Sequence, residues 1–185
     1  MNKTYLIVGQ GIVGTNLGIH LENNGHSVYF VDNNHQSAAS KLAAGLINPV
    51  TGKRIVKSWL IDTLLPYSLE FYIKLENQFD QKLVYPFNII RLVQNQMEEN
   101  DWHARTSVKD LQQYVLENFS TNDIEKINIP FSNGFITNSY RIDIQLIIEY
   151  YNLILKQKER IFQGQFEYNE IEFKNKYVYY HDNKY

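Results

Sequence analysis

The stretch YLIVGQGIVGTNLG, residues 5–18, decides the fold of this chain. Its first four residues are apolar and predict a short buried strand. Three glycines follow directly with the spacing G-x-G-x-x-G, namely Gly9, Gly11 and Gly14. In a motif with this spacing, the first glycine allows a tight turn and the second lets the backbone approach a ligand closely. The third lets a helix pack closely on the strand. The stretch therefore predicts strand, turn and helix.

The residues after the glycines extend this pattern. Apolar residues recur at a spacing of four at Val13, Leu17 and Leu21, which predicts an amphipathic helix with that face inward. The run Asn23-Asn24-Gly25 is typical of a helix C-terminus. The segment HSVYFVDNN, residues 26–34, then predicts a second strand.

Asp32 stands at the end of this second strand. An acid there accepts hydrogen bonds from ribose hydroxyls in dinucleotide-binding βαβ units. No arginine follows before Arg54, which disfavours a ribose 2′-phosphate and hence NADP. The alternative is that the three glycines only form turns and that Asp32 is a solvated strand end.

The next segment, HQSAASKLAAGLINPVTGKR (residues 35–54), is rich in small residues. Small side chains let backbone amides approach a bulky ligand. Asn48-Pro49 then predicts a turn of the chain away from that site. The alternative is a flexible loop that contains one helical turn.

The glycine motif, Asp32 and the run SKLAAGLINP (residues 40–49) resemble the N-terminal part of the D-amino-acid-oxidase-like FAD-dependent oxidoreductases. That family includes glycine and sarcosine oxidases and the oxidase domain of a bifunctional tRNA-modifying enzyme. The resemblance implies an α/β fold: a Rossmann-like FAD/NAD(P)-binding βαβ domain with an inserted α+β substrate domain, incomplete in this chain. The family more often has Glu where this chain has Asp32.

The resemblance also implies FAD as the cofactor and three groups of cofactor-binding residues. The turn and helix start contribute Gly9, Gly11, Ile12, Val13 and Gly14. The end of the second strand contributes Asp32 and Asn33. Near the pyrophosphate and ribityl chain lie Ser40 and Lys41, and beside the isoalloxazine lie Ala43, Ala44, Gly45, Leu46 and Ile47.

By the same resemblance the chain divides into three parts. Residues 1–60 form the FAD-binding part, residues 61–140 belong to the substrate domain, and residues 141–185 provide a return helix and a β-hairpin of the FAD-binding domain. Since family members are about twice as long, we expect this chain to be a truncated, N-terminal portion.

Local patterns in the later parts of the chain predict further elements. The first is a helix from near Asp62 to Phe79, followed by a strand over residues 85–95 and one or two surface helices over 97–119. Residues 134–155 predict a short strand, a turn and a helix. Residues 166–185 predict two strands joined at Lys174-Asn175-Lys176. Trp102 and His103 are conspicuous, and we interpret Trp102 as a packing residue.

Composition argues against several classes of function. The 185 residues carry a formal net charge of −2, with one small basic cluster at Lys53, Arg54 and Lys57, so nucleic-acid binding is unsupported. Without cysteine there is no disulfide or thiolate zinc site, and the five histidines show no metal-binding spacing, so we predict no metal. No apolar run is long enough for a membrane span, and the cytoplasm is the default location.

The resemblance implies oxidation of an amine C–N bond in an amino acid or related small molecule, with FAD as the oxidant. The substrate-binding residues of the family lie mostly beyond the part matched by this chain, so no catalytic residue is assigned and the chain alone is expected to be inactive. In the family an arginine typically binds the substrate carboxylate. Nothing but residue type suggests this role for Arg54, Arg91 or Arg141, and a surface role is favoured for each. The alternatives are a non-catalytic nucleotide-binding module that needs a partner chain, or an NAD-dependent reductase, against which the Ala-Ala-Gly-Leu-Ile run argues. The oligomeric state stays open.

Overall fold

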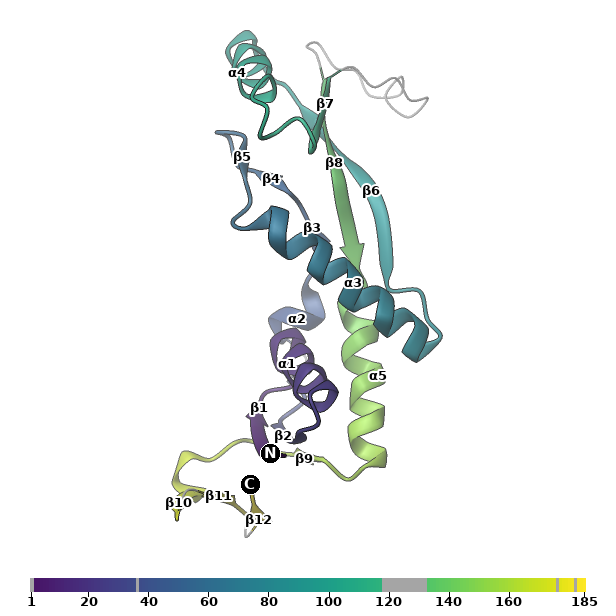
Figure 1. The fold of residues 1–185 in the computed structure, drawn as a ribbon. Coiled ribbons are helices and arrows are strands. Elements are labelled where there is room, and N and C mark those ends of the chain that lie inside the picture. Colours follow the sequence, from purple (N-terminus) through teal and green to yellow (C-terminus); the bar gives the residue numbers. More distant parts are fainter. Residues whose placement is uncertain (1, 36, 118–132, 176, 182) are drawn as a thin grey trace. The chain divides into compact units, whose positions relative to one another are not determined.

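A computed structural model describes residues 2–35, 37–117, 133–175, 177–181 and 183–185. The chain forms two compact units (Figure 1). Unit 1 comprises Met1–Ala43 and Ile144–Tyr185, and unit 2 comprises Ala44–Asp143. The predicted boundaries at residues 60 and 140 assigned residues 44–60 to the first part of the chain. In the structure these residues instead pair and pack within unit 2.

Unit 1 is built on a parallel sheet with the strand order β1-β2-β9. Its strands are β1 (Thr4–Val8), β2 (Ser27–Asp32) and β9 (Ile161–Gln163). Helix α1 (Ile12–Asn23) connects β1 to β2, and helix α5 (Ile144–Gln157) leads into β9. The predicted strand, glycine turn, helix and second strand are therefore confirmed.

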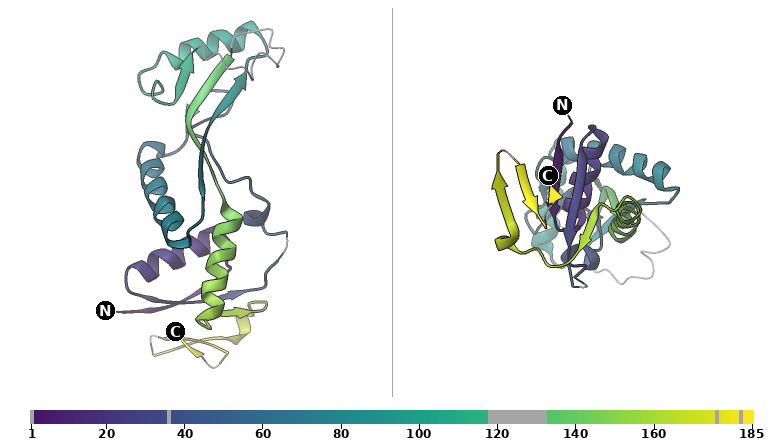
Figure 2. Two further views of the ribbon diagram at one scale, coloured as in Figure 1. Left: turned by 90° about the vertical axis from the view of Figure 1, so that its right-hand side faces the viewer. Right: turned by 90° about the horizontal axis from the view of Figure 1, so that it is seen from below.

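The two helices of unit 1 lie side by side and pack on one face of the sheet (Figures 1 and 2). Gly18 makes this packing possible, because a Cβ there would lie 2.7 Å from Phe30 Cζ on β2 and 2.9 Å from the Tyr151 hydroxyl on α5. Phe30 and Tyr151 themselves meet edge to face, with centroids 5.8 Å apart.

The predicted inward face of α1 is wrong. Val13 and Leu17 are 78% and 49% exposed, whereas the buried residues are Thr15, Gly18 and Ile19. Helices that must approach both a strand and another helix closely do so through small residues. Of the regularly spaced apolar residues, Val13 and Leu17 therefore lie on the outer face, and Leu21 is half-buried.

The other face of the parallel sheet is covered by a second, antiparallel sheet. It consists of β10 (Ile171–Lys174), β11 (Tyr177–Tyr180) and β12 (Asn183–Lys184), after a short 3₁₀ turn at Tyr168–Glu170. Aromatic rings join the layers, since Tyr29 meets Tyr185 at 5.1 Å and Phe162 meets Tyr180 at 6.4 Å. The predicted hairpin is confirmed; Lys176 in its turn lies outside the described residues.

Glu22, near the end of α1, ties the helix layer together. Its carboxylate accepts hydrogen bonds from the Tyr151 hydroxyl at 2.9 Å, from Arg160 at 2.9 Å and from Lys158 at 3.2 Å. Burial and the neighbouring carboxylate raise the pKa of Tyr151, so its hydroxyl stays a proton donor. The three donors belong to α5 and the segment after it, so one carboxylate fixes α5 against α1.

We expect Glu22→Ala to destabilise unit 1 by about 1–3 kcal/mol, because it leaves the Tyr151 hydroxyl and the Arg160 guanidinium without their acceptor. Urea unfolding monitored by circular dichroism measures the change. Glu167→Ala, at an exposed position, is the matched control and should change stability by less than about 0.5 kcal/mol. Equal effects of the two substitutions would contradict the role given to Glu22.

Unit 2 contains an antiparallel sheet with the order β3-β8-β6, and β7 also pairs with β8. The strands are β3 (Leu46–Ile47), β6 (Val84–Leu92), β7 (Val115–Glu117) and β8 (Asn133–Ile142). A separate hairpin is formed by β4 (Val50–Thr51) and β5 (Val56–Lys57).

Two predictions for this region are corrected. Residues 115–117 form strand β7 rather than helix, because they find a pairing partner in β8 that is distant in sequence. The strand predicted to be short is ten residues long, and only Asp143 separates it from α5, so there is no turn between them. The backbone N–H of Asp143 instead donates to the Leu83 carbonyl at 2.9 Å.

Two helices and the hairpin share one core with this sheet. Helix α3 (Ile61–Phe79) and helix α4 (Gln96–Thr106) confirm two predicted helices. The buried cluster consists of Val50, Ile55, Ile61, Leu65, Trp102, Leu111, Tyr114, Val115 and Ile136. Trp102 is 1% exposed and touches the backbone of β8, where a Cβ on Gly134 would lie 2.4 Å from its ring, so the packing role predicted for it is confirmed.

A network of ion pairs and hydrogen bonds lies at the edge of this core. Lys57 on β5 donates to both Asp62 and Asp110, and the Tyr114 hydroxyl donates to Asp62 at 2.6 Å. The hydrogen bonds from Lys57 and from Tyr114 hold the pKa of Asp62 below its usual range. Burial and the bond to Asp62 raise the pKa of Tyr114 to about 12.

This network predicts an acid-dependent loss of stability. Because the pKa of Asp62 is lower in the folded state, its contribution is present above the unfolded-state value near 3.8 and is lost as pH falls through the folded-state value. We therefore expect wild-type chain to melt at a higher temperature than Asp62→Asn at pH 7, and the difference to shrink below about pH 4. Thermal melts of both proteins between pH 7 and pH 3 measure this, and a difference independent of pH would contradict it.

Candidate functional site

The glycine turn at the end of β1 has the geometry that the motif requires. Gly9 has a φ of +92°, which favours glycine, and its N–H donates to the Val31 carbonyl at 2.8 Å. A Cβ on Gly14 would lie 2.1 Å from the Gly9 carbonyl oxygen. The first glycine therefore makes the turn, and the third lets α1 begin directly against it.

Ser40 lies over the N-terminus of α1. It belongs to the short helix α2 (Ala39–Leu42), and its Oγ accepts the N–H of Ile12 at 3.0 Å. A Cβ on Gly11 would stand 3.0 Å from the same oxygen, so the second glycine makes room for Ser40. Val13 and Gly14 follow in the first turn of α1, whose N–H groups have no acceptor within the helix. These N–H groups, together with the positive end of the helix dipole, can bind an anionic group.

Asp32 stands at the carboxyl end of β2 and is held by two backbone groups. Its Oδ1 accepts the N–H of Gln10 at 2.9 Å, and its Oδ2 accepts the N–H of Asn34 at 2.8 Å. A carboxylate offers about four lone-pair positions. Asp32 is thus fixed in orientation and retains acceptor capacity toward a ligand.

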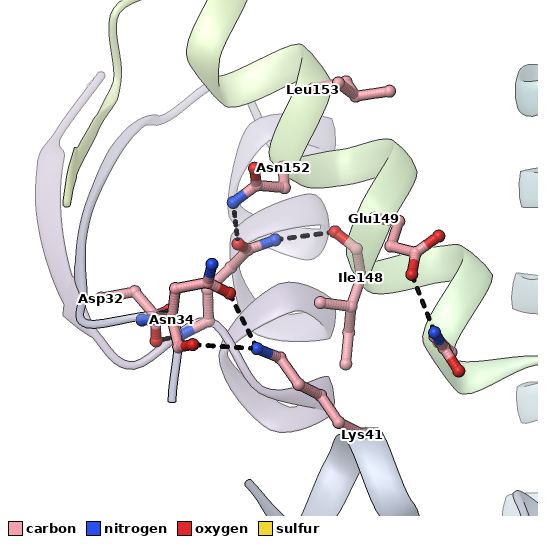
Figure 3. Close-up of a pocket in the computed structure, with 9 residues that line it drawn as sticks. Asp32, Asn34, Lys41, Ile148, Glu149, Asn152 and Leu153 are labelled. Carbon is pink, nitrogen blue, oxygen red and sulfur yellow. Dashed lines mark hydrogen bonds between the residues drawn. The ribbon is translucent and has the colours of Figure 1, made fainter. Parts of the chain in front are cut away.

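A cleft of about 440 Å³ opens beside Asp32 (Figure 3). Its lining comes from the glycine turn, β2, α2 and α5, and consists of Gln10, Asp32, Asn34, Lys41, Gln145, Ile148, Glu149, Asn152 and Leu153. The Lys41 ammonium donates to the side chain and the carbonyl of Asn34, at 2.7 and 3.2 Å. Two carboxylates, Asp32 and Glu149, therefore line one cleft together with an ammonium and several amides.

Gln10 joins the glycine turn to α5 and was not predicted from the sequence. Its side chain is 5% exposed, its Nε2 donates to the Ile148 carbonyl at 2.9 Å, and its Oε1 accepts from Asn152 (Figure 3). A signal for this pair exists in the sequence. Asn152 lies four residues after Ile148, which places a polar side chain on an otherwise apolar helix face, where it needs a partner.

The structure brings together only some of the predicted cofactor-binding residues. The glycine turn and the start of α1 bring together Gly9, Gly11, Ile12, Gly14 and Ser40. Asp32 and Lys41 line the cleft beside the turn. The side chain of Asn33 bonds Gln165 at 2.8 Å instead of lining the cleft, and Val13 is exposed. Ala43 directly follows α2, while Ala44, Gly45, Leu46 and Ile47 belong to unit 2.

The unit 2 residues of this set are held by strand pairing. Leu46 and Ile47 form β3, which pairs with Arg141 and Tyr140 of β8. The Gly45 carbonyl accepts the N–H of Ile142 at 2.8 Å. Ile47 packs against the core of unit 2, whereas Leu46 is exposed.

Neither a cluster of potential metal ligands nor a membrane-spanning helix is found in the described ranges. Among those residues, no three His, Asp or Glu side chains come together in a way that could hold a metal ion. In the same part of the chain, none of the helices has the length and apolar character needed to cross a membrane.

Comparison with models of protein families and with curated protein sequences finds no match. Solved structures do match. Iminodiacetate oxidase from Chelativorans sp. BNC1 is 17% identical with a TM-score of 0.66, over 94% of this chain and 49% of that one. Glycine oxidase from Bacillus cereus ATCC 14579 is also 17% identical with a TM-score of 0.66, over 96% and 49%. L-α-glycerophosphate oxidase from Mycoplasma pneumoniae, determined with FAD bound, is 17% identical with a TM-score of 0.57, over 96% and 49%.

These matches concern the fold and about half of each oxidase. The chain spans about half the length of the solved structures that it matches. The predicted fold class, a mixed α/β architecture with a parallel sheet, is confirmed, and so is the likeness in fold to D-amino-acid-oxidase-like oxidoreductases such as glycine oxidase.

Proposed function

We propose that this chain forms part of an FAD-dependent oxidoreductase and that unit 1 binds the ADP portion of the cofactor. The observation that carries this proposal is the combination of the glycine turn and the start of α1 with the fixed carboxylate of Asp32, which lines a cleft together with Gln10 of the turn. The solved oxidase that carries FAD supports it at the level of fold.

The residues present fit such a ligand. The N-terminus of α1 suits a pyrophosphate, and the Ser40 hydroxyl, which accepts the Ile12 N–H, stands at the same helix end. Asp32 has acceptor capacity for the two ribose hydroxyls, and Lys41 and Asn34 stand beside it. Together they complement a diphosphate on one side and a sugar on the other.

The reaction that we propose is oxidation of an amine C–N bond in a small amino acid or related compound. FAD, when bound, supplies the hydride acceptor. The chain's own contribution is to bind and orient the ADP portion, and we expect it to need the rest of the fold for turnover, since the matched oxidases are about twice as long. The isoalloxazine contacts predicted for Ala43–Ile47 remain part of this proposal.

Substitution of Asp32 tests the cofactor assignment. Loss of a charged acceptor costs about 1.5–3 kcal/mol, so Asp32→Asn should weaken FAD binding about tenfold or more. Asp32→Glu keeps the charge and should bind within a few-fold of wild type. Asp80→Asn, an exposed acid in unit 2, is the matched control and should leave binding unchanged.

Titration of each variant with FAD, followed by flavin fluorescence, gives the dissociation constants. The same variants titrated with NAD, followed by isothermal titration calorimetry, test the alternative of an NAD-dependent reductase. Tight binding of NAD without binding of FAD would overturn the proposal. So would FAD binding that is equal in wild type and Asp32→Asn.

A further inference from the structure

A second pocket, in unit 2, carries three positive side chains. It has a volume of about 310 Å³ and is lined by Lys53, Arg54, Val56, Asp101 and Arg105. Lys53 and Arg54 come from the turn between β4 and β5, and the other two charged residues come from α4. With one carboxylate against three cations, the charged lining has an excess of two positive charges.

These three cations differ from four other cations of the same unit. Lys57, Lys74, Lys82 and Arg141 each lie within ion-pair distance of a carboxylate. Within the described residues, Lys53, Arg54 and Arg105 have no such partner. Three positive groups beside a single carboxylate repel one another, and this repulsion is relieved when an anion binds between them.

The turn that presents Lys53 and Arg54 is held in an unusual conformation. Ile55, which ends it, has a φ of +51°, a backbone conformation that is strained for a β-branched residue. Ile55 is 1% exposed and belongs to the core cluster that also contains Trp102 of α4. Burial of Ile55 therefore fixes the turn on the same core that fixes α4.

The side chain of Arg91 on β6 stabilises the turn by binding the backbone of the turn. Its guanidinium donates to the Gly52 carbonyl at 2.8 Å and to the Lys53 carbonyl at 3.4 Å. Asp101 and Arg105 stand four residues apart on α4, on either side of the buried Trp102 in sequence, and so share one face of the helix. Both walls of the pocket are thus attached to the core of unit 2.

We propose that this pocket binds the phosphate group of a small molecule. Two guanidinium groups offer planar pairs of donors that match phosphate oxygens, and Lys53 adds a point charge. An excess of two positive charges matches a phosphate monoester dianion. The chain's net charge of −2 and the isolation of this cluster favour a small ligand over the backbone of a nucleic acid.

Titration of the full 185-residue chain with inorganic phosphate at pH 7.5, in constant chloride, tests the proposal. Amide ¹⁵N–¹H NMR spectra locate binding residue by residue, so the pocket is distinguished from the glycine turn of unit 1. We expect shifts at residues 52–56 and 101–105. Arg54→Gln combined with Arg105→Gln should weaken this binding at least tenfold, while Lys74→Gln should leave it unchanged.

Because Arg54 and Arg105 are exposed, we expect the double variant to keep a folded spectrum, and Lys53→Gln alone serves as a second variant with a severalfold loss. The proposal is overturned if phosphate shifts only residues 11–14, or if the double variant binds like wild type. It is also overturned if a twelve-nucleotide RNA shifts residues 52–56 while saturating phosphate does not.

Discussion

Gly14→Ala is expected to abolish binding of FAD and to destabilise unit 1 by more than the roughly 1–3 kcal/mol of ordinary overpacking. The added Cβ would stand 2.1 Å from the carbonyl oxygen of Gly9. A backbone atom cannot rotate away as a side chain can, so the turn and the start of α1 must separate. That movement removes the helix N-terminus from the place where a pyrophosphate would lie.

Urea unfolding and FAD titration of the same preparation measure the two effects of Gly14→Ala. Gly25→Ala is the matched control, because nothing lies within 4 Å of a Cβ at Gly25 and only its φ of +78° is unfavourable. The control should lose about 1–2 kcal/mol and keep its affinity for FAD. If Gly14→Ala binds FAD like wild type, the glycine turn is not part of the cofactor site.

Trp102→Ala has the largest expected effect in unit 2, a loss of about 3–5 kcal/mol. The side chain is 1% exposed and packs between α4 and the backbone of β8 at Gly134. Its removal leaves a cavity in the core cluster that also holds the β4–β5 turn in place.

Comparison with Trp102→Phe separates packing from hydrogen bonding. The indole Nε1 of Trp102 is buried without a hydrogen-bond partner among the described residues, so Phe removes no bond and should cost clearly less than Ala. Trp59→Ala, 80% exposed, is the control and should change stability by less than about 0.5 kcal/mol. Urea unfolding followed by circular dichroism gives all three values, and similar losses for Trp59→Ala and Trp102→Ala would contradict the central place of Trp102 in the core of unit 2.

The order of elements in unit 1 could be predicted because each signal is local. The glycine spacing, the run of apolar residues before it and the acid at the end of β2 all lie within the first 32 residues. The inward face of α1 could not be predicted in the same way. Which face lies inward depends on Phe30 and Tyr151, and Tyr151 lies far along the chain on α5.

The residues of the candidate site divide in the same way, into those indicated by nearby sequence and those whose partners lie far along the chain. Asp32 and Ser40 could be singled out from the first 40 residues, and both lie by the glycine turn. Gln10 could not, because its partners Ile148 and Asn152 are supplied by a helix more than a hundred residues later. Strand β7 was mistaken for helix for the same reason, since its pairing partner β8 is distant in sequence.

The most direct test of the central claim is a visible absorption spectrum of the 185-residue chain after mixing with FAD and desalting, with and without excess ADP. We predict that flavin absorbance at about 450 nm is retained in about equimolar amount and is displaced by ADP, because unit 1 is proposed to hold the ADP portion. Absence of retained flavin, together with no detectable binding of FAD or ADP up to millimolar concentration, would contradict the account.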